Sequence, residues 1–160
     1  MQKVTILCVG KLKEKFYADA AAEYAKRLSR FCKPEILELP EARLSEAPSP
    51  AEMEQALLEE AGRVEAKLPK SGALIALCIE GTELSSPALA EALSSFAVSG
   101  ASQLTFLIGG SVGLHPSLKA RADLRLSMSP MTFPHHLARV MLLEQIYRAY
   151  QIQAGSRYHK

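Results

Sequence analysis

The chain has 160 residues, 48% of them hydrophobic and 22% charged, with a formal net charge of +2 at pH 7. This composition is typical of a globular protein and predicts one domain, residues 1–160, that is large enough to bury a substantial core. No apolar run approaches the roughly 18 residues of a membrane-spanning helix, and the lysines directly after the first apolar run argue against a signal peptide, so we expect a cytoplasmic protein.

The first half of the chain alternates between predicted strands and helices. Lys3–Val9 is apolar and β-branched and predicts a strand, whereas Phe16–Phe31 has apolar residues four apart and predicts a helix. Pro34–Leu39 alternates apolar and acidic residues, which is typical of a half-buried strand. A Ser-Pro pair at 49–50 predicts the start of a helix that runs to about residue 68.

The second half continues this alternation. Ala73–Ile79 and Leu104–Ile108 are continuous apolar runs, as expected of strands covered on both faces. Between them a Ser-Pro pair at 86–87 begins a helix that ends near residue 100. A short helical turn at 116–122, a short strand at 124–128 and a long helix at 134–154 complete the chain. The pattern predicts an α/β fold with a mainly parallel sheet covered by helices on both faces.

Charge is distributed unevenly along the chain. Residues 1–33 carry eight Lys and Arg against three acids, residues 34–66 carry two against nine, and residues 115–160 carry seven against two. The two basic ends are either ordinary solvated helix faces, or surfaces that meet in space and face an anion such as RNA phosphate.

A cluster of glycines, Gly109-Gly110-x-x-Gly113, follows an apolar run directly. The spacing is not that of the dinucleotide-binding fingerprint, and no Gly-Lys-Ser/Thr follows as in a phosphate-binding loop. The glycines therefore either form a tight strand-to-helix turn or let backbone amides approach a ligand at the carboxyl end of a strand. The three cysteines lie far apart without a Cys-x-x-Cys pair, so we expect neither a disulfide framework nor a metal site.

The segment from Met128 to Phe133 is irregular, with two methionines, an aromatic ring and a central proline. Such a loop offers apolar contact to a flat ring and carbonyl or amide groups to its edge, although a loop that merely plugs the core is the alternative. His135 and His136 follow in the first turn of the last helix. Because helix N-terminal amides disfavour the imidazolium there, we expect both to be neutral and to cap or pack.

Apolar residues from Val140 to Tyr150 cover a broad surface of the predicted last helix. A helix with so much apolar surface is either deeply buried or shared with a partner chain, and a homodimer is our hypothesis. After a Gly-Ser pair, the chain ends in Tyr158, His159 and Lys160. These residues either bring ring-bearing and titratable groups to a site or form a disordered basic tail.

Several stretches together resemble, in order and over nearly the whole chain, the RlmH family of SPOUT-class methyltransferases, which modify a pseudouridine of the large ribosomal subunit. The stretches include Gly10-Lys-Leu-Lys, Ile-Glu80-Gly81, Ile108-Gly-Gly-Ser-Val-Gly113 and Met131-Thr-Phe-Pro-His135. They end with Glu144-Gln-Ile-Tyr147-Arg148 and Tyr158-His159-Lys160.

The resemblance implies an α/β knot, with the C-terminal part threaded into a trefoil, and a homodimer with a composite site at its interface. It implies S-adenosylmethionine as the cofactor and no metal. The substrate would be a pseudouridine of 23S rRNA on the assembled ribosome, methylated at N3. By family pattern, the cofactor would be held mostly by backbone at Leu77, Gly109, Gly110, Met128, Ser129, Pro130, Met131, Thr132 and Phe133.

The same resemblance assigns catalytic roles to the last helix and the tail. His159 or a bound water would accept the proton of the base, and Tyr158 would stack on or orient the base. Arg148 and Lys160 would stabilise the developing anion or grip phosphate, and Glu144 would hold Arg148. Two alternatives remain open from the sequence: a SPOUT methyltransferase acting on another RNA such as tRNA, and a non-catalytic ribosome-binding or nucleotide-binding module.

Overall fold

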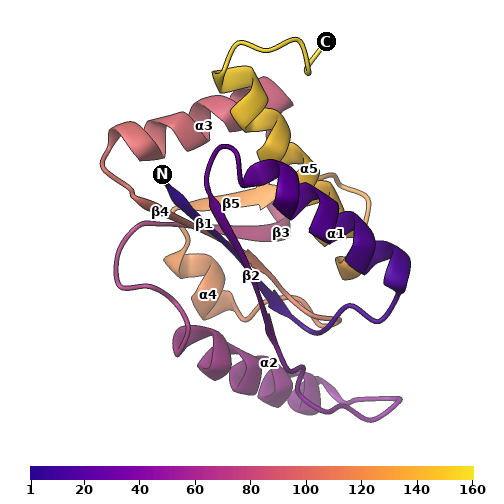
Figure 1. The fold of residues 1–160 in the computed structure, drawn as a ribbon. Helices are drawn as coiled ribbons and strands as arrows, with labels where there is room; N and C mark the ends of the chain where they lie inside the picture. The colour runs from indigo at the N-terminus through magenta and orange to yellow at the C-terminus, as the bar shows by residue number, and fades with distance from the viewer.

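Strands and helices alternate throughout the computed structural model, which describes residues 1–160 (Figure 1). In chain order the elements are β1 (Lys3–Val9), α1 (Lys15–Leu28), β2 (Lys33–Leu39), α2 (Pro50–Glu65), β3 (Ala73–Glu83), α3 (Ser86–Val98), β4 (Gln103–Ile108), α4 (Pro116–Arg121), β5 (Leu124–Ser127) and α5 (His135–Gln153). The ten elements predicted from the sequence are all present, and the largest difference in bounds is at the end of β3.

The strands form one sheet in the order β2-β1-β4-β3-β5, and every neighbouring pair is parallel. In Figure 1, α1, α3 and α5 cover one face and α2 and α4 cover the other. The larger hydrophobic core lies under α1, α3 and α5, and a smaller one lies under α2 and α4. This arrangement confirms the predicted α/β fold with helices on both faces.

Strand β1 shows why both faces must be covered. Val4, Ile6 and Cys8 enter the larger core, whereas Leu7 and Val9 enter the smaller one. All five side chains are at most 2% exposed. Because alternate residues of a strand point to opposite faces, a continuous apolar run needs a layer of helices on each side.

Strand β3 extends to Glu83, beyond the predicted end at Ile79. Leu77 and Thr82 are both paired with Leu126 of β5, so the four residues between them bulge out of the ladder. Gly81 lets β3 pair with β5 again after the bulge, because a Cβ at this position would come within 2.7 Å of the backbone of Arg125. The prediction ended early because this contact between distant residues leaves no local pattern.

The predicted helix starts are confirmed by their capping hydrogen bonds. The Ser49 side chain accepts a hydrogen bond from the backbone N–H of Glu52, whose carboxylate accepts one from the N–H of Ser49, which completes a capping box. Ser85 accepts in the same way from the N–H of Ala88.

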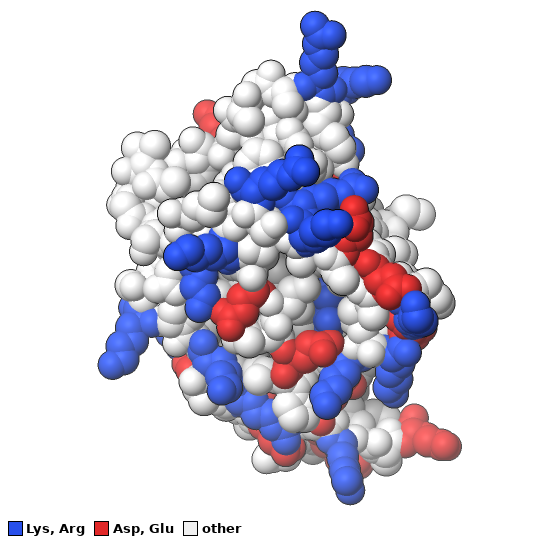
Figure 2. Space-filling model, viewed as in Figure 1, with Lys and Arg blue, Asp and Glu red and all other residues white.

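Helix α5 lies between α1 and α3 on one face of the sheet (Figure 1). Every residue from His135 to Ile152 is buried or half-buried. Neighbouring elements of the same chain therefore bury one side of α5 fully, and its half-buried residues remain partly accessible to a partner chain. The packing of α1 against α5 also brings the two basic ends together. Lys and Arg gather over the C-terminal half of α1 and at the C-terminal tail in Figure 2. None of the helices combines the length and apolar character needed to cross a membrane.

Candidate active site

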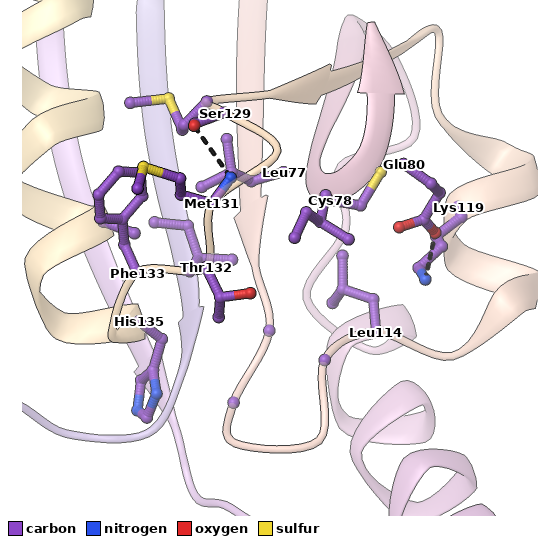
Figure 3. Close-up of a pocket in the computed structure, with 17 residues that line it drawn as sticks. Leu77, Cys78, Glu80, Leu114, Lys119, Ser129, Met131, Thr132, Phe133 and His135 are labelled. Atoms are coloured by element: carbon purple, nitrogen blue, oxygen red, sulfur yellow. Dashed lines mark hydrogen bonds and ion pairs between the residues drawn. The ribbon is translucent and has the colours of Figure 1, made fainter. Parts of the chain in front are cut away.

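A pocket of about 270 Å³ lies at the carboxyl ends of β4, β3 and β5 (Figure 3). Most of its lining comes from three segments: residues 77–80 at the bulge of β3, residues 108–114 at and after the end of β4, and residues 128–135 after β5. In parallel α/β sheets this edge is where ligands bind, because the loops that leave the strands there leave a crevice between them. The lining contains these predicted cofactor residues: Leu77, Gly109, Gly110, Met128, Ser129, Met131, Thr132 and Phe133. Pro130 is exposed and lies outside the lining.

The glycine turn after β4 is tight and also borders the pocket. The N–H of Gly113 donates a 3.0 Å hydrogen bond to the carbonyl of Gly110. A Cβ at Gly109 would overlap the carbonyl of Gly113, which itself has a φ of +79°. The two interpretations left open by the sequence are therefore compatible, since the glycines close the turn on themselves and leave backbone as the pocket wall.

The loop after β5 is held by its own serines. The Ser127 hydroxyl donates to the carbonyl of Ser129 at 3.2 Å, and the N–H of Met131 donates to the Ser129 hydroxyl at 3.0 Å. With these bonds fixed, Met128 and Phe133 give the pocket an apolar wall beside exposed backbone groups. A flat, partly polar ring fits such a wall.

The predicted catalytic residues of α5 and the tail form a second cluster. The Tyr158 hydroxyl donates to the Glu144 carboxylate at 2.9 Å, and an Arg148 nitrogen lies 2.8 Å from the same oxygen. Arg148 also lies 3.2 Å from Nδ1 of His159 and 4.7 Å from the centre of the Tyr158 ring. The tail is thus folded back onto α5 and is not free, while Lys160 is exposed and takes no part in an ion pair.

Electrostatics within this cluster follow from the shared carboxylate. Partial burial, together with the hydrogen bond to Glu144, raises the pKa of Tyr158. The hydrogen bond that Arg148 donates to the Glu144 carboxylate raises the pKa of Arg148, which keeps the guanidinium charged. Tyr158 is therefore a neutral hydrogen-bond donor beside a fixed positive charge.

The pocket and the tail cluster lie apart within one chain. Ala138 is the last residue of α5 that lines the pocket, and the Cα positions of Glu144 and Arg148 follow about 9 and 15 Å further along the helix axis. The Tyr150 hydroxyl donates to the side chain of Gln2, just before β1, at 2.8 Å. The end of α5 therefore lies at the amino edge of the sheet, opposite the pocket.

Comparison with known proteins places the chain in a family. A family model described as a predicted SPOUT methyltransferase matches residues 2–159. The chain is 48% identical over 158 residues to the ribosomal RNA large subunit methyltransferase H of Streptococcus equi subsp. zooepidemicus, covering 99% of both proteins. It is 45% identical over 157 residues to the protein of the same name from Leuconostoc mesenteroides, covering 98% of this chain and 99% of that one. This chain belongs to the RlmH family of SPOUT methyltransferases.

The overall fold of the chain is shared with a solved structure. A probable methylase family protein from Haemophilus influenzae Rd KW20 superposes with a TM-score of 0.55 at 13% identity, covering 98% of this chain and 70% of that one.

Among the lining residues that were not predicted from the sequence as site residues, four are titratable: Cys78, Glu80, Lys119 and His135. Glu80 and Lys119 form an ion pair of 2.5 Å at the end of the pocket opposite His135 (Figure 3), and the hydrogen bond from Lys119 lowers the pKa of Glu80. Burial raises the pKa of Cys78, which agrees with an unreactive thiol. The position of Glu80 directly before Gly81 could have indicated a site residue from the sequence. Lys119 reaches the pocket from α4, and no sequence pattern indicated its role.

His135 has an unusual environment in this pocket. Burial and the neighbouring His136 lower the pKa of His135, in agreement with the expected neutral ring. Its Nε2 is buried without a hydrogen-bond partner, and the Glu41 carboxylate lies 3.4 Å away without hydrogen-bond alignment. No group of three or more His, Cys, Asp or Glu side chains converges in a way that could hold a metal ion.

Proposed function

We propose that this protein, as one methyltransferase domain in the cytoplasm, transfers a methyl group from S-adenosylmethionine to N3 of a pseudouridine in 23S rRNA. The substrate would be the assembled ribosome. The observation that carries the proposal is the docking of Tyr158 and His159 onto Glu144 and Arg148, which fixes acid–base groups where a disordered end would offer none. The printed names of the relatives support a large-subunit rRNA substrate.

The pocket fits S-adenosylmethionine on three counts. Its volume of about 270 Å³ is near the lower end of ordinary ligand pockets. Its wall at Met128 and Phe133 is apolar, as an adenine ring requires, and backbone at Gly109-Gly110 borders it. The unpartnered Nε2 of His135 offers a hydrogen bond to a hydroxyl group of the ligand. When bound, the cofactor supplies a methyl group attached to a sulfonium sulfur, and the sulfur becomes the neutral thioether of the leaving group.

The chain's own residues would prepare the base for this transfer. His159, or a water that it holds, accepts the proton of the imide N3. The guanidinium of Arg148, kept charged by Glu144, stabilises the anion that develops on the base. The Tyr158 ring orients the base, and the exposed Lys160 contacts phosphate. Most of the remaining acceleration would come from alignment of the nucleophile with the methyl group.

A homodimer would bring the two clusters together. Methyl transfer requires reacting atoms about 3–3.5 Å apart, whereas the pocket and tail cluster of one chain lie toward opposite edges of the sheet. The half-buried residues of α5, including Tyr147, leave part of that helix for a partner chain. In the proposal, the tail of one subunit reaches the pocket of the other, and a C-terminal trefoil knot fixes the loops of that pocket.

The test is transfer of a labelled methyl group from S-adenosylmethionine to intact ribosomes, free large subunits and bulk tRNA in parallel. Nucleoside mass spectrometry identifies any product. Methylated pseudouridine from ribosomes is the expected result, and label on tRNA alone would overturn the substrate. A variant lacking residues 158–160 should lose transfer at least a hundredfold but bind the cofactor normally. Normal transfer by this variant would refute the role of the tail.

A further inference from the structure

A row of rings runs from the pocket wall to the surface of the protein. His135 lines the pocket, and its ring centre lies 4.2 Å from that of His136. His136 lies 6.5 Å from Tyr17, which in turn lies 4.4 Å from Phe16. Phe16 is 66% exposed, so the outermost ring of this row is open to an external ligand. We call these four residues the ring row.

Two lysines accompany the ring row on the loop before α1. Leu12 between them packs against the larger core, and its N–H donates to the Glu38 carboxylate at 3.0 Å. Because Leu12 is directed inward, Lys11 and Lys13 are directed outward, and both are exposed. Neither takes part in an ion pair, whereas Lys15, the next lysine, pairs with Asp19 at 2.8 Å. Two positive charges therefore remain available to an external anion.

The loop is held firmly beside the pocket. Cys8 of β1 is paired with Ile108 of β4, and Ile108 lines the pocket, so the chain leaves β1 next to the site. The Gly10 carbonyl accepts a 3.1 Å hydrogen bond from the buried Arg139. The carboxylate of Glu14 lies 3.1 Å from Nδ1 of His136, which joins the loop to the start of α5.

We propose that Phe16, at the exposed end of the ring row, and the two lysines bind an unpaired segment of the substrate RNA next to the target base. Phe16 stacks on one base, and Lys11 and Lys13 contact the phosphates on either side of it. Aromatic side chains interleaved with cations are the usual means of holding single-stranded RNA, because every base has a face to stack and every nucleotide has a phosphate. This inference rests on the proposed function, in that the RNA is its substrate.

A second copy of the chain is the competing occupant of this surface. The lysines favour RNA, because lysine is depleted in the buried parts of protein–protein interfaces. A homodimer contact centred on Phe16 would have to desolvate Lys11 and Lys13, and the acid on the same loop, Glu14, already faces His136. RNA phosphate satisfies both charges and leaves the ring free to stack.

The experiment compares Phe16→Ala, Phe16→Trp and the double variant Lys11→Ala/Lys13→Ala. Matched controls on the opposite face and edge are Leu58→Ala, which truncates an exposed side chain of α2, and Lys67→Ala/Lys70→Ala. Three quantities are measured for each variant: the KM and kcat for methylation of ribosomes at several salt concentrations, cosedimentation with ribosomes in the absence of cofactor, and S-adenosylmethionine affinity by calorimetry.

Loss of one stacked base should raise the KM for ribosomes and weaken cosedimentation between about fivefold and a hundredfold in Phe16→Ala, with kcat and cofactor affinity unchanged. Phe16→Trp should restore binding. The lysine variant should reduce the slope of log affinity against log salt by about 1.4, or about 0.7 per lost single-strand phosphate contact. The controls should behave as wild type.

If the Phe16 and lysine variants are active and match the wild type in KM, cosedimentation and salt dependence, this surface does not bind RNA. The proposed function would still stand. A wild-type protein that binds ribosomes through this surface but transfers no methyl group would overturn the proposed function alone. If Phe16→Ala instead converts a dimer to a monomer in sedimentation velocity, the occupant is a second copy and the inference is wrong.

Discussion

The side chain of Arg139 joins α5 to the ends of β1 and β2, and its removal is a sharp test of how the site is held. The residue is 2% exposed. One of its nitrogens lies 2.7 Å from the Glu38 carboxylate, and another donates to the Gly10 carbonyl at 3.1 Å. Arg139→Ala would remove the donor to the Gly10 carbonyl and the charged partner of Glu38, which would keep only the hydrogen bond from the N–H of Leu12.

The cost can be worked out from these contacts. Breaking a buried ion pair by removing one partner costs about 3–5 kcal/mol. The Glu38 side chain is 32% exposed, so water can partly replace the guanidinium, and the lower end of this range applies. We expect a loss of about 3 kcal/mol in the free energy of unfolding, or about 6–12 °C in Tm for a chain of this size.

The loss should also depend on pH. Burial alone would raise the pKa of Glu38, but the hydrogen bond and charge of Arg139 outweigh it, and the pKa lies below the ordinary 4.5. A carboxyl group with a lowered folded-state pKa stabilises the protein fully above its unfolded pKa, and this stabilisation is lost as pH falls through the folded value. The difference between wild type and Arg139→Ala should therefore be constant from pH 7 to about 5 and shrink below about 4.5.

The assay is urea unfolding followed by circular dichroism, at one protein concentration and at several pH values. Lys15→Ala removes an exposed pair with Asp19 and serves as the control, with an expected loss below about 0.5 kcal/mol. A loss below about 1 kcal/mol for Arg139→Ala, or a loss that is the same at pH 7 and pH 4, would refute the reasoning.

Three further predictions concern single side chains. Gly109→Ala should weaken S-adenosylmethionine binding at least tenfold in calorimetry while the protein stays folded, because the added Cβ overlaps the Gly113 carbonyl and opens the turn; unchanged affinity would contradict this. Gly62→Ala should raise the free energy of unfolding by about 0.5–1 kcal/mol in urea titrations, because this glycine lies inside α2 with no atom in the way; a destabilised variant would show that the position is constrained. Tyr158→Phe keeps the ring over Arg148 but removes the hydrogen bond to Glu144, so kcat for ribosome methylation should fall about tenfold at unchanged cofactor affinity, and a wild-type kcat would argue against an ordered tail.

Local patterns were sufficient for most of the secondary structure. The apolar run of β1 and the Ser-Pro helix starts depend only on neighbouring residues, and both agree with the structure. The strand order could not be predicted in this way, because nothing in β1 indicates that its partners will be β2 and β4. The end of β3 was wrong for the same reason, since it depends on the approach of Gly81 to β5.

The candidate site likewise has residues that local sequence patterns indicated and residues that only contacts between distant segments bring to it. Glycines and prolines at strand ends pointed to the loops that line the pocket, and the resemblance supplied the tail residues. Lys119 and Arg139 gave no signal, because a single cation on a helix is ordinarily solvated. The bond from Arg139 to Glu38 spans 101 positions, and the bond to Gly10 spans 129, so the burial of Arg139 is decided by packing between distant segments.

The position of β1 inside the sheet, between β2 and β4, has a consequence for synthesis of the chain. One edge of β1 can pair with β2 early, but the other must wait for β4, which ends at Ile108. At translation rates of about 5–20 residues per second, the stretch from Leu39 to Ile108 takes roughly 3–14 s to make. During that time an apolar strand edge has no partner, and such edges promote aggregation. The free edge of β1 is therefore the expected site of aggregation in the nascent chain until β4 has been made.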